Sequence, residues 1–491
     1  MTTEARELFP PRPEGVPADL TAPTAAYRRH TWLAFLGLLG FVGLYVGLTG
    51  YLGWIVYRLL YDAFTGGNAV LGVVLAILPT FFLVFLVRGL FVVKHLEDPT
   101  RVQVTEDEQP ELFAFVNRIA DEAGAPRPHK LYLSARVNAA VFYDLSFLNL
   151  LFPTRKNLEL GLGLVQNLGL DELKAVIAHE FGHFAQRTMA VGRWVYVAQQ
   201  IAGHIIVHRG WVDRLLQGLS YTDLRIAWIG WILRLIVWSI RAVLDTAFRL
   251  IVLAHRALTR EMELQADLVA VSVSGSDSLI HALHRLGPAD DAWDQAVRFS
   301  NTEIDKKRPP EDLFAVQERI LEHLRRVLDD EGFGAVPPRP KLGGEAHRVF
   351  EEALAQPPRM WSTHPPNRER EDNAKRRYVP SPLDPRPAWS LFRDAAVVRR
   401  SVSRRFYDAG GPEPIREAAV PIEETLARVD EDYRRPSLDR RYRGAYLNRT
   451  IVGFAPKVAN LYTKVDDHDA AAILRGIDGL YPEPLKDDLE R

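Results

Sequence analysis

The chain of 491 residues contains no cysteine. This absence excludes disulfide bonds, thiolate nucleophiles, Cys-ligated iron–sulfur clusters and every zinc site that needs a Cys ligand. Any metal ion must therefore be held mainly by His, Asp and Glu side chains. Any nucleophile must be Ser, Thr, a carboxylate or an activated water.

The chain also lacks an excess of charge of either sign. Its 61 Lys and Arg residues are balanced by 62 Asp and Glu residues, which gives a net charge of −1. There is thus no overall basic field for nucleic acid, and we find no nucleic-acid motif, phosphate-binding glycine loop or internal repeat. With 47% hydrophobic and 25% charged residues, the composition is typical of a folded protein. We expect no nucleic-acid partner.

Two long segments near the N-terminus lack charged side chains altogether. Thr31 to Tyr57 is one such run, and Ala69 to Val87 is the other. An apolar helix of about 20 residues crosses the hydrocarbon core of a bilayer. Buried helices of a soluble core are the alternative, but such helices rarely run this long without a charge. The sequence therefore predicts two transmembrane helices within residues 31–95, with the lipid bilayer as a partner.

The distribution of Lys and Arg predicts the orientation of these helices. The connecting loop from Tyr61 to Asn68 has no Lys or Arg, whereas both flanking segments do: Arg6, Arg12, Arg28, Arg29, Arg88, Lys94 and Arg101. Positive residues favour the cytoplasmic side. We expect both flanks, and the domain that follows, to be cytoplasmic in a protein of the cell inner membrane. Residues 1–30, rich in proline, are predicted to form a flexible, extended tail.

One predicted helix, Leu170 to Arg187, has the spacing of a metal site. His179 and His183 are four residues apart, so both imidazoles lie on one helical face and can bind one ion. Glu180 is next to the first His and can reach a water on the metal without binding the metal. This is the HExxH arrangement of a zinc hydrolase.

A catalytic zinc needs a third protein ligand. The segment Thr259 to Asp267, which reads TREMELQAD, offers Glu261 and Glu263. We prefer Glu263, because Asp267 lies four residues later on the same helical face. There it can accept the free N–H of a ligand histidine.

These motifs together resemble the HtpX and CAAX-prenyl endoprotease family of membrane zinc metallopeptidases. The resemblance covers roughly residues 30–375, and Glu371 stands where the family has an aliphatic residue. The matching features are the two N-terminal spans, GLGLVQNLGLDELKAVIAHEFGH at 161–183, ExxAD at 263–267, Asn138-Ala139, and Thr363-His364-Pro365-Pro366 with Arg370.

The resemblance implies a fold and a site. The fold is mainly α with a small β-sheet: N-terminal transmembrane helices plus a zincin-like α+β metallopeptidase domain. One Zn²⁺ per chain is bound by His179, His183 and Glu263, with Glu180 as the catalytic base. The oxyanion needs a second electrophile, which His364 or Arg370 could supply. Alternatively, His364 covers the metal at rest, or the segment is a His-Pro turn with a structural Arg. Asn138 and Ala139 correspond to the substrate-side strand.

The predicted organisation has four parts: the tail 1–30, the spans 31–95, a peptidase domain 96–375 and an accessory region 376–491. The domain contains an apolar helical insertion at 190–255, where one helix face has Arg234, Arg241, Asp245 and Arg249. We expect it to be embedded in the membrane or to lie against it. Other expected elements are strands at 130–138 and 157–162 and helices at 107–123, 311–329, 345–356 and 388–406.

Two functions follow from these patterns. The first is a membrane-bound zinc endopeptidase acting on protein or peptide substrates in membrane protein quality control or processing. The second is a non-hydrolytic membrane scaffold that retains a structural zinc. Glu180 favours the first, because a structural zinc site has no need of a carboxylate there.

Overall fold

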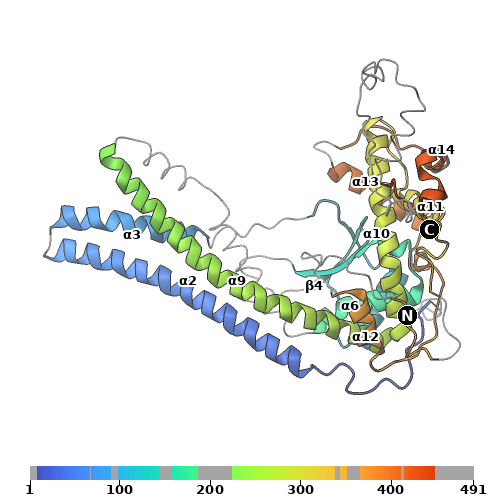
Figure 1. Cartoon of the computed structure of the whole chain (residues 1–491), viewed down its shortest axis with the longest axis horizontal. Helices are drawn as coiled ribbons and strands as arrows, with labels where there is room; N and C mark the ends of the chain where they lie inside the picture. The colour runs from blue at the N-terminus through green and yellow to red at the C-terminus, as the bar shows by residue number, and fades with distance from the viewer. Residues whose placement is uncertain are drawn as a thin grey trace, which may run out of the picture.

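The computed structural model describes residues 8–66, 68–89, 98–143, 156–185, 224–337, 343–350, 365–410 and 414–447. These residues form a mainly helical protein with one small mixed sheet. Two long N-terminal helices project from the part that contains the sheet (Figure 1). The predicted fold class is confirmed.

Helices α2 (Ala25–Thr65) and α3 (Ala69–Gly89) contain the two uncharged segments. Both are long and apolar enough to cross a membrane. They pack closely, because a Cβ added at Gly72 of α3 would lie 2.3 Å from the Ala63 side chain of α2. Large apolar side chains such as Trp32 and Val70 are exposed at 63% and 75%. Such a surface is costly in water, which favours a lipid environment.

Helix α9 (Leu224–Ser274) is one continuous helix of 51 residues, about 77 Å long at 1.5 Å per residue. It lies beside α2 and α3 over part of its length (Figure 1), with Phe248 against Phe41 and Arg241 over the Phe85 ring. Arg249 and Asp245, one turn apart on the helix face noted in the sequence, form an ion pair at 2.8 Å. The apolar segment from residue 224 and the TREMELQAD segment are therefore parts of one helix. Residues 190–223 of the predicted insertion lie outside the described residues.

Four short strands form the sheet in the order β1-β2-β4-β3: β1 (Val102–Val104), β2 (Leu131–Ser134), β4 (Lys156–Gly161) and β3 (Ala139–Tyr143). β2 and β4 are parallel, and the other two pairs are antiparallel. The strand expected over 130–138 ends at Ser134. The chain bends tightly there because Gly161 approaches the Arg136 carbonyl, where a Cβ would lie 2.1 Å from the oxygen.

The helices around the sheet share one core. They are α4 (Pro110–Glu122), α5 (Leu162–Val165), α6 (Leu170–Ala185), α10 (Ser276–Asp305), α11 (Leu313–Leu328), α12 (Asn367–Lys375), α13 (Ala395–Gly410) and α14 (Ile422–Asp432). Short 3₁₀ turns cover Ala388–Leu391, Pro436–Leu438 and Arg440–Tyr442. The expected helix at 388–406 is divided at Phe392. The expected helix at 345–356 is wrong over 345–350, where the chain forms turns.

Both flanking regions pack into this core. From the tail, Phe9 is buried against Phe115, and the fully buried Lys174 donates a hydrogen bond to the Pro10 carbonyl. Burial lowers the pKa of Lys174 to about 8. Residues 8–24 form no helix or strand, yet they are held on the domain. From the C-terminal side, Val402 and Val429 join the same core, so residues 376–447 do not form a separate unit.

Candidate active site

The HExxH motif lies in the second half of α6. The helix begins where the Glu172 carboxylate accepts the Gly169 N–H at 2.7 Å. Acidic residues there, Asp171 and Glu172, suit the positive end of the helix dipole. Apolar residues on the other faces, including Ile177 and Phe181, are fully buried. The remaining face presents the two histidines and Glu180.

A close crossing of α6 and α9 brings the third acidic residue to this face. A Cβ added at Gly182 would lie 2.8 Å from the Cα of Ala266, so the helices touch backbone to backbone at this point. Gly182 belongs to the HExxH segment, and Ala266 lies between Glu263 and Asp267. Small residues at these two positions therefore allow both carboxylates to reach the histidines.

Three side chains converge into one possible metal site. The Nε2 atoms of His179 and His183 each lie 3.4 Å from a different oxygen of the Glu263 carboxylate. One donor atom from each residue lies within 4.8 Å of the others. Tetrahedral zinc with ligands at 2.0–2.1 Å separates its ligand atoms by about 3.3 Å. Two imidazoles and a carboxylate at this spacing fit a zinc ion.

The two candidate third ligands point to different places. Glu261 faces the start of α2, where its carboxylate lies 3.4 Å from the Thr24 hydroxyl and 3.9 Å from His30 Nδ1. The neighbouring Arg260 does not pair with Glu261 but with Glu369, at 2.6 Å. Glu263 is buried between the two histidines of α6. The structure thus brings Glu263, and not Glu261, to the possible metal site.

Asp267 contacts the His179 ring nitrogen that faces away from Glu263, and Arg370 in turn contacts Asp267. An Asp267 oxygen lies 2.9 Å from His179 Nδ1. Arg370 donates two hydrogen bonds to the same carboxylate, at 2.9 Å from Nε and 2.6 Å from Nη2. His179 is then oriented with Nδ1–H toward Asp267 and Nε2 toward Glu263, the tautomer that a metal ligand needs.

These contacts shift the pKa values of the buried groups. Burial alone would lower the pKa of His179, but hydrogen bonds to Asp267 and Glu263 raise it to about 9 in the absence of a metal ion. Burial opposes ionisation of Asp267, yet the adjacent Arg370 holds the pKa of this carboxyl below its usual value. The pairing with Arg370 therefore favours the ionised form of Asp267.

Comparison with known proteins fits this geometry. Residues 106–378, more than half of the chain, match the model of peptidase family M48. The chain belongs to peptidase family M48. M48 peptidases bind zinc, and the His179, His183 and Glu263 group offers donor atoms that could hold such an ion.

Several curated proteins are similar to the M48 part of this chain. Two are named protease HtpX homologs, from Pyrococcus furiosus (29% identical over 196 residues) and Pyrococcus abyssi (30% over 198 residues). A third is a protease HtpX homolog from Gemmatimonas aurantiaca, 30% identical over 196 residues. These matches cover 37–40% of this chain and 59–60% of each relative's length. No solved structure matches the chain.

The other site residues predicted from the sequence fall in different places. Glu180 is partly exposed on the same helix as the histidines. Its charge, with those of Asp267 and Glu263, keeps the pKa of Arg370 raised although burial lowers it. Arg370 lies on α12, behind Asp267. His364 lies outside the described residues.

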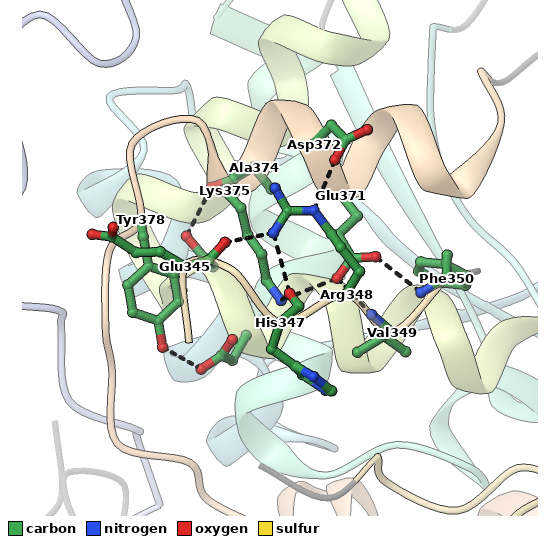
Figure 2. Close-up of polar contacts among 12 residues, drawn as sticks. Glu345, His347, Arg348, Val349, Phe350, Glu371, Asp372, Ala374, Lys375 and Tyr378 are labelled. Atoms are coloured by element: carbon green, nitrogen blue, oxygen red, sulfur yellow. Dashed lines mark hydrogen bonds and ion pairs between the residues drawn. The ribbon is translucent and has the colours of Figure 1, made fainter. Parts of the chain in front are cut away.

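Helix α12, which positions Arg370 in this M48 site, is held to the segment 343–350 by Glu371 and Lys375 (Figure 2). The fully buried Glu371 accepts the backbone N–H groups of Val349 and Phe350 at 2.8 and 2.9 Å. Lys375, one turn later, pairs with Glu371 at 3.0 Å and donates to the His347 carbonyl. Glu371 thus joins the segment 343–350 to α12.

Sequence reasoning did not predict these contacts of Glu371 and Lys375. Glu371 and Lys375 are spaced i,i+4 on a helix, a pattern that usually indicates a solvent-exposed pair. Only their burial, at 0% and 5% exposure, distinguishes them from such a pair. The signal in the sequence was that Glu371 stands where the family resemblance implies an aliphatic residue.

The substitution Arg370→Ala should destabilise the domain strongly. It would leave Asp267 as a buried anion without its cation, which typically costs about 3–5 kcal/mol. The matched control is Arg260→Ala, because its pair with Glu369 is exposed and such pairs contribute about 0–1 kcal/mol. Chemical unfolding in detergent measures both. Equal losses for the two variants would contradict the support role of Arg370.

Proposed function

We propose that the chain is a membrane-bound zinc endopeptidase that hydrolyses peptide bonds in membrane or misfolded proteins at the cytoplasmic face of the inner membrane. The observation that carries this proposal is the position of Glu180. It is a partly exposed carboxylate next in sequence to the buried His179, whose ring contacts Glu263. A structural zinc site has no use for such a group, whereas a hydrolase needs a base there.

Each residue of the site has a defined task in this proposal. Bound by His179, His183 and Glu263, a zinc ion would polarise the scissile carbonyl and lower the pKa of a water molecule. Glu180 takes the proton from the attacking water and delivers it to the leaving amine. Asp267 holds the His179 ring in its ligand tautomer.

Arg370 has a different task from the one first considered. Its Nε and Nη2 atoms both donate to Asp267, and its side chain is 7% exposed. This arrangement supports a role in positioning Asp267 rather than in contacting the oxyanion. Of the two residues predicted as the oxyanion electrophile, His364 remains the proposed one, with a cover for the metal at rest or a structural turn as its alternatives, and it lies outside the described residues.

Reversible removal of the metal tests the catalytic proposal. Full-length protein in detergent, treated with a chelator and dialysed, should lose cleavage of casein, because the ligand set requires an ion for Lewis-acid chemistry. One equivalent of zinc per chain should restore it. If zinc-replete protein binds one zinc ion per chain and still cleaves no protein substrate, the scaffold function is favoured instead.

The placement in the membrane rests on three helices. α2 and α3 have exposed apolar surfaces, and α9 adds exposed Trp231, Leu235 and Trp238 beside them. Because α9 continues to Glu263, the membrane part and the metal site are joined by one rigid element. The site would then lie close to the cytoplasmic surface, where loosely folded membrane proteins are accessible.

Single-cysteine labelling tests the orientation, since the natural chain has no cysteine to interfere. Asn68→Cys lies between α2 and α3, and Glu106→Cys lies after β1, both at exposed positions. An impermeant maleimide added to intact cells should label Asn68→Cys only, because loops without Lys or Arg face outward. Labelling of Glu106→Cys under these conditions would contradict a cytoplasmic site. Permeabilised cells provide the control for reactivity.

A further inference from the structure

Among the described strands, β3 lies at one edge of the sheet, and it begins beside a cavity of about 510 Å³. Among the described strands, β3 has a neighbour on one side only. Gly161 N–H donates a hydrogen bond to the Asn138 carbonyl, and this bond determines which residues of β3 have their backbone groups turned toward β4 and which have them turned away. By that alternation, the backbone N–H and C=O groups of Ala139 and Val141 point away from β4. An extended peptide can pair with such an edge.

The cavity begins where this edge begins. Asn138, the residue just before β3, lines it together with Arg136 and Val137 of the preceding bend. The opposite end of β3 lies near the metal-binding helix, since Lys156, the register partner of Tyr143, donates to the Phe184 carbonyl next to His183. Five residues of strand span about 16 Å. A peptide paired along β3 would therefore run from the cavity toward the metal-binding helix.

The lining selects for an apolar occupant. Its inner part consists of Trp293, Val297 and Phe406 from α10 and α13, with the Trp293 and Phe406 rings 5.6 Å apart. The arginines of the rim already have carboxylate partners, because Arg136 pairs with Asp98 at 3.0 Å and Arg298 lies 3.8 Å from Asp294. The rim of the cavity thus has charged side chains that are already paired, whereas its interior is apolar and aromatic.

We propose that this cavity is a specificity subsite, which receives a bulky apolar side chain (Phe or Leu) of an extended substrate peptide paired with β3. The inference rests on the proposed peptidase function and names its substrate class: chains with an exposed bulky apolar residue on one side of the cleaved bond. Such residues are exposed in unfolded segments and buried in folded ones. The subsite would therefore favour loosely folded substrates.

Peptide binding tests the subsite without requiring turnover. Zinc-loaded Glu180→Gln protein, full length in detergent, is titrated with fluorescein-labelled alanine-rich peptides in which a single Phe is moved along the chain. We expect one Phe position to tighten binding by about 10–200-fold over Ala, the range of discrimination that an apolar pocket provides. Val297→Trp, which fills the cavity from a partly exposed position, should abolish this preference and leave the all-Ala peptide unaffected.

Two further variants make the result decisive. Val397→Trp adds the same ring to α13 at a position that is 57% exposed and does not line the cavity, so the Phe preference should persist. Phe406→Ala enlarges the cavity and should move the preference from Phe toward Trp. A preference that survives Val297→Trp, or equal weakening of the Phe and Ala peptides, would overturn the subsite. Wild-type protein that hydrolyses nothing while this discrimination persists would instead overturn the peptidase function alone.

Discussion

Glu180→Gln should abolish most peptidase activity and leave the metal content unchanged. The amide keeps the volume of the side chain and cannot accept the proton of the attacking water. Turnover should fall by about 10²–10⁴, the usual contribution of a positioned acid or base. None of the three converging donor atoms belongs to Glu180, so zinc should remain near one per chain. Metal analysis and hydrolysis of a quenched peptide, on the same preparation, measure both quantities.

His183→Ala is the matched comparison, because it removes a donor from the same helix face. It should lose zinc and activity together, since an incomplete ligand set binds metal poorly. A Glu180→Gln protein with full activity would contradict the proposed base. A Glu180→Gln protein that also lost its zinc would indicate that Glu180 is a ligand, which the arrangement of His179, His183 and Glu263 does not support.

Local patterns predicted much of this architecture. The uncharged runs correspond to α2 and α3, and the predicted helix from Leu170 to Arg187 corresponds to α6, where Leu173, Ile177 and Phe184 recur at helical spacing and are buried. Both signals work because helix periodicity and apolar length are properties of a single segment. The strand expected at 157–162 corresponds to β4 at Lys156–Gly161 for the same reason.

Features that depend on distant segments could not be predicted in this way. The tail was predicted to be flexible because it is rich in proline, but Phe9 packs between Phe115 of α4 and Lys174 of α6. The segment 380–387 has the Pro-rich composition of a linker, yet near its end the Arg386 carbonyl accepts a hydrogen bond from Leu170 N–H at the start of α6. Burial of Glu371 likewise required residues 343–350, more than 20 positions away. No local pattern encodes such contacts.

The choice between Glu261 and Glu263 shows how far spacing alone can reach. Both acids lie in TREMELQAD, and the only feature of the sequence that favoured Glu263 as the ligand was Asp267, four residues later. In the structure, the two side chains are two residues apart on α9 and therefore point to different sides of it. Glu263 faces the histidines, and Glu261 faces Thr24 and His30 at the start of α2.

This difference predicts opposite results for the two alanine variants. Glu263→Ala removes one of three donors and should weaken zinc binding by more than about 100-fold, because loss of a residue that only supports a ligand already costs about 10–100-fold. Activity should fall with it. Glu261→Ala removes an exposed contact to α2, worth about 0–1 kcal/mol, and should keep both zinc and activity.

Competition with a chromophoric chelator measures the zinc affinity of both proteins in the same detergent, and thermal unfolding shows whether each is folded. Glu263→Asp is the conservative variant. It retains the carboxylate but shortens its reach by about 1.5 Å, so affinity should recover only in part, as expected for a ligand whose distance to both imidazoles matters. If Glu261→Ala loses zinc while Glu263→Ala retains it, the ligand set of His179, His183 and Glu263 is wrong. A ligand role demands the reverse, because only Glu263 has a carboxylate oxygen 3.4 Å from each histidine Nε2.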